Sequence, residues 1–91
     1  MTRAKKWFMY IVRCNDHSLY CGITTDIKRR VHEHNKSPKG AKYTRSRRPV
    51  KLVAQCEYQT RSDAAKAEIK FKSMHKSDKE KMISLPSSQL P

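Results

Sequence analysis

Five side chains in this sequence have the types and the order needed to hydrolyse a phosphodiester. They are two phenols, a guanidinium, an imidazole and a carboxylate: Tyr10, Tyr20, Arg30, His34 and Glu68. A phenol or an imidazole can take the proton of an attacking water, and a fixed cation can stabilise the charge on the phosphoryl group. A carboxylate can hold a divalent metal ion. No single residue of this set is specific, but the ordered set favours this chemistry.

The two tyrosines are predicted to lie in a strand hairpin. Residues 7–12 are largely aromatic or β-branched and are apolar on both alternating faces, which is typical of a central strand. Turn-forming residues follow at 15–18, and residues 19–23 have the composition of a returning strand. An odd number of loop residues would put Tyr10 and Tyr20 on the same face of the sheet, and an even number would separate them. The sequence leaves the register open, whereas the chemistry requires a shared face.

A helix that begins after Asp26 and runs to about residue 35 is predicted to carry the guanidinium and the imidazole. Two aliphatic residues four positions apart define its apolar side: Ile27 and Val31. At about 100° per residue, His34 falls on that side and Arg30 at its edge. Arg29 and Glu33 are expected to point the other way. Arg30 is therefore the better candidate of the two adjacent arginines.

The rest of the chain is predicted to form a loop over 36–49, a third strand over 50–58, a helix capped by Ser62 and a last short helix from Ser77 to Ile83. One domain is expected over residues 7–83, preceded by a basic lead at 1–6 and followed by a flexible tail at 84–91.

Glu68 lies in the middle of the apolar arc of the helix that follows Ser62. A carboxylate in that position is costly unless it is paired with a cation or a metal ion. The alternative to a metal ligand is a structural ion pair with Arg30 or Lys72, and Lys72 also intrudes on the apolar arc.

The charge of the chain favours a polyanionic partner. Twenty-one lysines and arginines against eight acidic residues give a formal net charge of +13. Such a field attracts nucleic acid; an anionic membrane is the weaker alternative, because the cations are spread along the chain. The predicted loop carries five cations and an aromatic residue that could stack on a base, a plausible nucleic-acid footprint: Lys39, Lys42, Tyr43, Arg45, Arg47 and Arg48.

The rest of the composition argues against membrane-spanning, disulfide-rich and zinc-binding proteins. No stretch approaches the roughly 20 apolar residues of a membrane span. Cys14, Cys21 and Cys56 are odd in number and lack Cys-x-x-Cys spacing, so neither a disulfide framework nor a zinc site is indicated. A reduced, cytoplasmic protein is expected, with no membrane association and a monomer as the default state.

The ordered set resembles the GIY-YIG nuclease domain, which is named after two tyrosine tripeptides. Here these are Met9-Tyr10-Ile11 and Tyr20-Cys21-Gly22, so a methionine replaces the first glycine. The resemblance continues through the helix start at 26–30 and covers nearly all of residues 7–83. It is greatest to the small stand-alone bacterial members of largely unassigned function, which share a segment like Lys39-Gly40-Ala41-Lys42-Tyr43-Thr44-Arg45.

This resemblance implies an α+β fold with a small three-stranded antiparallel sheet flanked by helices. It also implies a divalent-metal-dependent endonuclease with Mg²⁺ or Mn²⁺ on Glu68, and the expected substrate is DNA in repair or processing. Tyr10, Tyr20 or His34 would draw the proton from water. Arg30 would stabilise the phosphoryl charge.

Two other readings stay open. The chain could be a nucleic-acid-binding module on a nuclease fold with little or no cleavage activity, or a basic RNA-associated protein without a metal.

Overall fold

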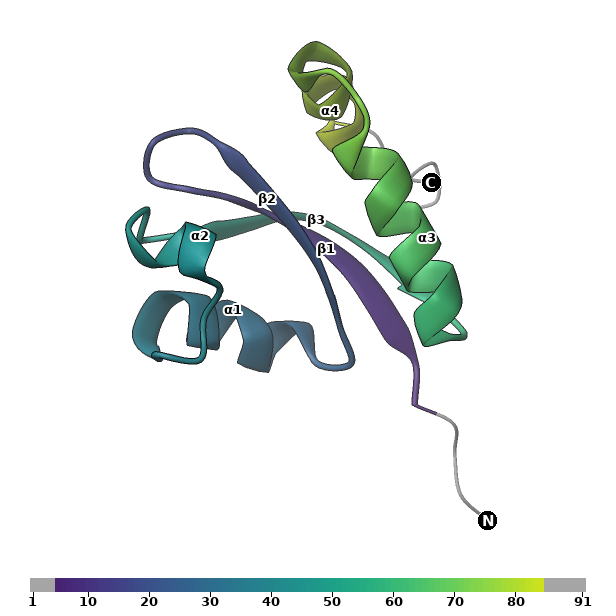
Figure 1. Ribbon diagram of the computed structural model, residues 1–91, viewed down its shortest axis with the longest axis horizontal. Helices are drawn as coiled ribbons and strands as arrows, with labels where there is room; N and C mark the ends of the chain where they lie inside the picture. Colours follow the sequence, from purple (N-terminus) through teal and green to yellow (C-terminus); the bar gives the residue numbers. More distant parts are fainter. Residues whose placement is uncertain (1–4, 85–91) are drawn as a thin grey trace.

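The computed structural model describes residues 5–84 and has an α+β fold (Figure 1). Its elements in chain order are β1 (Trp7–Arg13), β2 (Leu19–Thr24), α1 (Ile27–Lys36), α2 (Lys42–Arg45), β3 (Lys51–Tyr58), α3 (Arg61–Lys72) and α4 (Lys76–Ile83). The three strands form one antiparallel sheet flanked by the helices, as predicted. The expected basic lead and tail lie outside the described residues, apart from Lys5, Lys6 and Ser84.

The strand order is β2-β1-β3, which confirms the first strand as the central one. The loop between β1 and β2 covers residues 14–18, an odd number. Tyr10 consequently pairs with Gly22, and Val12 pairs with Tyr20. Side chains alternate between faces along a strand, so Tyr10 and Tyr20 share a face of the sheet.

The two faces are covered by different helices. Figure 1 shows α1 and α2 on one side of the sheet and α3 with α4 on the other. The α3 side buries an apolar cluster of Met9, Ile11, Cys21, Ala67 and Phe71. The α1 side buries Tyr10, Val12, Cys14 and Val50, with Tyr20, Ile27, Val31 and Leu52 packed against them.

The predicted loop over residues 36–49 is wrong in one respect, because it contains α2. This helix is only four residues long, and its N-cap residue, Ala41, offers no capping side chain. A single turn shows no apolar periodicity, so the sequence pattern could not reveal it.

Two predicted helix starts also differ. The cap of α3 is Thr60, whose hydroxyl accepts a hydrogen bond from the Asp63 N–H at 3.1 Å, rather than Ser62. The last helix begins at Lys76 rather than at Ser77. The shifts amount to one or two residues, the usual uncertainty of helix ends.

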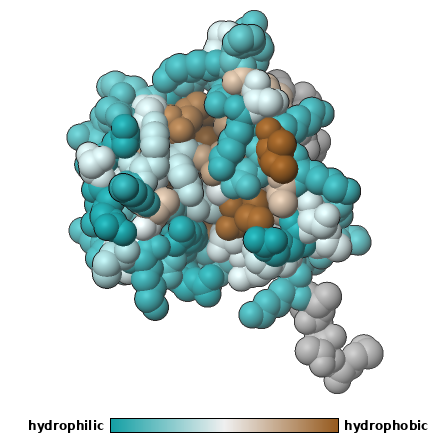
Figure 2. All heavy atoms as spheres, viewed as in Figure 1, coloured by the Kyte–Doolittle hydropathy of each residue, from teal (hydrophilic) through white to brown (hydrophobic). Residues whose placement is uncertain are grey.

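Across residues 5–84, no helix is both long and apolar enough to cross a membrane. Figure 2 shows hydrophobic side chains reaching the surface in the middle of the face viewed, over β2 and α3, within a hydrophilic surround.

Candidate active site

The centre of the candidate site is a buried hydrogen bond between a tyrosine and a histidine. Asp26 caps α1 by accepting from the Arg29 N–H at 3.0 Å, and the helix then turns His34 toward the sheet. Tyr10 is 1% exposed and His34 is fully buried. Their Oη and Nε2 atoms lie 2.6 Å apart. Position 34 thus lies on the core side of α1, as predicted.

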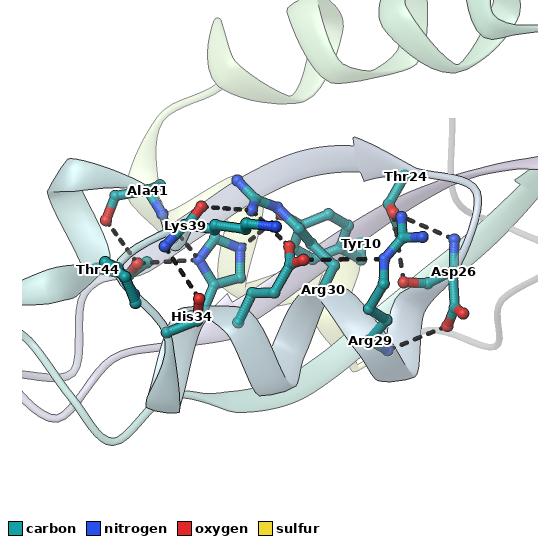
Figure 3. Close-up of polar contacts among 12 residues, drawn as sticks. Tyr10, Thr24, Asp26, Arg29, Arg30, His34, Lys39, Ala41 and Thr44 are labelled. Carbon is teal, nitrogen blue, oxygen red and sulfur yellow. Dashed lines mark hydrogen bonds and ion pairs between the residues drawn. The ribbon is translucent and has the colours of Figure 1, made fainter.

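The segment around α2 holds the other side of the imidazole (Figure 3). His34 Nδ1 lies 2.9 Å from the Thr44 hydroxyl, which donates to the Ala41 carbonyl at 2.9 Å. A hydroxyl has one proton, so Thr44 accepts from Nδ1–H, and Nε2 accepts from the Tyr10 hydroxyl. These two bonds assign the Nδ1-protonated tautomer of His34. The Ala41 N–H lies farther away, 3.4 Å from Nδ1, and would suit the Nε2-protonated tautomer.

Two glycines allow these close approaches. A Cβ atom on Gly22 would lie 2.6 Å from the Tyr10 hydroxyl, so only glycine lets Tyr10 lie across β2. A Cβ atom on Gly40 would lie 2.7 Å from the Glu33 carbonyl oxygen. Glycine at position 40 therefore lets the loop approach α1 closely enough for Ala41 and Thr44 to reach His34.

Burial keeps both partners of the central hydrogen bond neutral. It lowers the pKa of His34 to about 4, and the nearby charge of Arg30 lowers it further. It also raises the pKa of Tyr10 to about 12, against an opposing effect of Arg30. At neutral pH a neutral phenol therefore donates to a neutral imidazole.

Tyr20 is the partly exposed member of the aromatic group. Its ring centre lies 6.5 Å from that of Tyr10 and 5.2 Å from that of His34. Tyr43 extends the group on the outer side of Tyr20: the two rings stack with their centres 5.9 Å apart and an interplanar angle of 24°. Tyr10 and His34 do not reach an open surface, because the sheet, α1 and α2 enclose them.

Arg30 lies beside this group and is held by two contacts. Its guanidinium donates to the Glu33 carboxylate at 2.9 Å and to the Lys39 carbonyl at 2.9 Å (Figure 3). Arg29 points to solvent as expected, with a side chain 58% exposed. Glu33 does not, because its carboxylate turns back along α1 to pair with Arg30, three residues earlier.

Glu68 comes from α3, on the other layer of the fold. Its side chain is 22% exposed, and its carboxylate pairs with the Lys72 ammonium at 3.4 Å, one of the two ion pairs considered for it. Glu68 also lies near Cys21 of β2. Burial raises the pKa of that thiol to about 12, and the carboxylate adds to the effect.

The donor set around Glu68 fits one type of metal binding. Residues 5–84 contain no group of three or more His, Cys, Asp or Glu side chains able to surround a metal ion. Mg²⁺ is usually bound through one or two carboxylates and keeps several waters and substrate phosphates as ligands. A single half-buried carboxylate facing an exposed ammonium is compatible with that mode, with Glu68 as the protein ligand.

All three predicted nucleic-acid-binding arginines make contacts within the protein. Arg48 donates to the carbonyls of Glu33, His34 and Ser37 and so satisfies the C-terminal end of α1. Arg45 donates to the Pro38 carbonyl at 3.1 Å.

Arg47 has two roles at once. It pairs with Asp16 at 3.0 Å, and its guanidinium lies 4.0 Å from the centre of the Tyr43 ring. Lys39, Lys42 and Tyr43 are exposed, as a nucleic-acid surface requires.

Sequence reasoning missed one residue that shapes the site, Thr44, and one contact of Lys72. Thr44 is fully buried and orients His34; its signal was the segment over 39–45 shared with stand-alone GIY-YIG proteins. Lys72 pairs with Glu68, as the alternative based on helical spacing had it. Its ammonium also lies 6.0 Å from the centre of the Tyr20 ring, a contact that the sequence did not indicate.

The family model described as the GIY-YIG catalytic domain matches residues 6–82, and the chain belongs to this family. The fold is thus that of a nuclease domain.

Several relatives carry the name UPF0213. A UPF0213 protein of Desulfotalea psychrophila is 52% identical over 77 residues, which is 85% of this chain and 70% of the relative. One from Staphylococcus epidermidis is 53% identical over 78 residues, 86% of this chain and 94% of the relative. The solution structure of the UPF0213 protein BH0048 from Bacillus halodurans has 39% identity and a TM-score of 0.59, covering 92% of this chain and 88% of that one.

Proposed function

We propose that this protein is a divalent-metal-dependent endonuclease that hydrolyses nucleic-acid phosphodiesters, with DNA favoured over RNA. The observation that carries the proposal is the hydrogen-bonded series Tyr10–His34–Thr44 beside the Arg30 guanidinium, with Tyr20 against its outer side. When water attacks a phosphodiester, the reaction needs a positioned base, a fixed cation and an accessible phenol.

The two neutral partners support a coupled proton transfer. A free Tyr10 phenolate is disfavoured, since burial raises the pKa of Tyr10 to about 12. The Tyr10 hydroxyl can instead take a proton from water while it gives its own to His34 Nε2 across 2.6 Å. Thr44 supports this transfer by holding the proton of the imidazole on Nδ1. The transfer requires the substrate-bound site to admit water past Tyr20, the more exposed phenol.

Arg30 and Glu68 are assigned the electrostatic roles. Arg30 would exchange its contacts with Glu33 and the Lys39 carbonyl for the oxygens of the scissile phosphate. Glu68 would hold the metal ion in place of its pairing with Lys72. A bound divalent ion supplies Lewis acidity and lowers the pKa of its water.

The test is a cleavage panel of labelled single-stranded, duplex, nicked and branched DNA together with RNA, each with Mg²⁺ or with chelator. Arg30→Ala and Glu68→Ala should each reduce Mg²⁺-dependent cleavage by about 10²–10³-fold, the usual effect of one preorganised electrostatic group. Affinity should change little, because 20 or 21 of the basic residues remain. Arg29→Ala is the matched control, since it removes an exposed arginine from the same turn of α1.

Cleavage that persists in chelator, or an Arg30→Ala protein as active as Arg29→Ala, would contradict the proposal. Melting curves isolate the metal site. Mg²⁺ should raise the Tm of the wild type and not that of Glu68→Ala. An equal response of the two proteins would rule out Glu68 as the ligand.

A second function, nucleic-acid binding with little cleavage, is favoured by a specific observation. Arg30 and Glu68 each already have a partner of opposite charge, Glu33 and Lys72. If those pairs persist with substrate bound, neither residue reaches a phosphate or a metal ion. A protein that binds the panel but cleaves none of it at saturating Mg²⁺ would support this function.

A further inference from the structure

A half-open pocket of about 280 Å³ adjoins the candidate active site. It is formed by β2, α2, α3 and α4, so segments distant in sequence contribute to it. Its lining combines aromatic and aliphatic side chains with two lysines: Leu19, Tyr20, Tyr43, Phe71, Lys72 and Lys79.

The aromatic wall of the pocket is fixed before any ligand arrives. Tyr43 is 39% exposed, yet Arg47 stacks on its ring at 4.0 Å and donates to its carbonyl at 2.9 Å. Arg47 is itself held by Asp16 at 3.0 Å. Tyr20 is held between Tyr43 and His34, with ring centres 5.9 and 5.2 Å away. A planar ligand would therefore meet a preorganised surface and lose little affinity to side-chain ordering.

Two ammonium groups lie at this aromatic surface. Lys72 Nζ is 6.0 Å from the centre of the Tyr20 ring, and Lys79 Nζ is 5.5 Å from that of Phe71. Lys72 also contacts the Glu68 carboxylate at 3.4 Å, which joins the pocket to the proposed metal ligand. An apolar, aromatic recess with cations beside it is complementary to a flat heteroaromatic ring that carries a phosphate.

We propose that this pocket binds the unpaired base of a substrate nucleotide, while Lys72 and Lys79 contact the phosphates next to it. This inference rests on the proposed function and narrows its substrate. A base inside a duplex is stacked on both sides and must be extruded at a cost before it can enter a pocket, whereas an unpaired base is available. The preferred substrate is therefore a nucleic acid with at least one unpaired nucleotide beside the scissile phosphate.

Binding of metal-free protein tests the pocket apart from catalysis. Fluorescence anisotropy in chelator would compare a labelled single-stranded oligodeoxynucleotide with an abasic deoxyribose-phosphate chain of equal length and charge. The wild type should bind the base-containing chain about ten-fold more tightly, within the range for stacking on an aromatic side chain. Tyr43→Leu should remove this difference and leave abasic binding unchanged, while Tyr43→Phe should keep it.

A second pair of variants tests the cations. Lys79→Met should weaken binding of both chains, because it removes a phosphate contact. Lys81→Met removes the same charge from an exposed position of the same helix and should have a smaller effect. Circular dichroism would verify that each variant is folded.

The outcomes separate this inference from the proposed function. Equal affinity of the wild type for the two chains, or a Tyr43→Leu protein that keeps the base preference, would overturn the pocket assignment, even if Mg²⁺-dependent cleavage is found. A base preference lost in Tyr43→Leu, without cleavage of any substrate in Mg²⁺, would support the pocket and refute the endonuclease. If the wild type bound neither oligonucleotide chain, both the pocket assignment and the proposed function would be overturned.

Discussion

The two faces of the sheet are stabilised by different interactions. On the α3 face, buried apolar side chains such as Met9, Ile11 and Phe71 pack together. On the α1 face, the most buried side chains include Tyr10, His34 and Thr44, whose polar atoms bond to one another. Apolar burial is non-directional and adds stability, whereas a buried polar group is tolerated only with a partner in a defined position. The α3 face therefore mainly stabilises the fold, and the α1 face fixes the relative positions of the side chains in the candidate site.

This difference also predicts how each face responds to pH. Apolar packing involves no proton, so its contribution is insensitive to pH. A neutral buried imidazole contributes only while it stays neutral. Mutations on the two faces should therefore differ both in how much they lower the free energy of unfolding and in how that loss depends on pH.

The largest expected effect is on the apolar face. Phe71 is 1% exposed, and Phe71→Ala should lower the free energy of unfolding by about 3–5 kcal/mol, through lost burial and the cavity that remains. Urea denaturation at neutral pH would measure it. Ile69→Ala is the matched control, because Ile69 lies on the same helix, is 69% exposed and should change stability by less than about 0.5 kcal/mol. If Phe71→Ala also changed the pH dependence of the free energy of unfolding, the proposed difference between the two faces would be contradicted.

The next effect is acid destabilisation through His34. Its pKa is about 4 in the folded protein against an ordinary 6.5, so the unfolded chain binds the proton first as pH falls. Stability should be fully present above pH 6.5 and decrease by up to about 3 kcal/mol as pH falls to 4. Urea midpoints across this window would measure the slope.

Two variants identify the source of that slope. His34→Gln should be less stable at neutral pH but have a flatter profile between pH 6.5 and 4. His32→Gln, at an exposed position of the same helix, should keep the wild-type slope. A His34→Gln protein with an unchanged slope would assign the acid sensitivity to another group.

The comparison of faces also explains what the sequence predicts well. A short run that is apolar on both faces identified β1 as central, and the 3.6-residue period placed His34 on the inner side of α1, because apolar burial governs both. The shared face of Tyr10 and Tyr20 needed the loop length, which composition does not determine. Once the structure gives residues 14–18 as the loop, the register follows.

Polar contacts between distant segments were the part that could not be predicted. The Thr44–His34 bond depends on a one-turn helix and on the absence of a side chain at Gly40. The internal role of Arg48 depends on the path of the chain after α2. Helical projection gave Glu33 the wrong direction, because a long side chain can turn along the helix to reach Arg30. Such contacts carry no periodic signal.

The smallest expected effect concerns the exposed charge beside each face. If Lys42 and Arg45 contact phosphates, their joint replacement by Gln should reduce the slope of log affinity against log salt by about 2 and weaken all sequences about equally. The matched control replaces Lys66 and Lys70, two exposed cations of α3, and removes the same charge. Because counterion release counts phosphates contacted rather than net charge, the control should leave the slope near that of the wild type. Equal slopes for the two double variants would show that the +13 charge acts as a diffuse field, with no nucleic-acid surface on the α1 and α2 side.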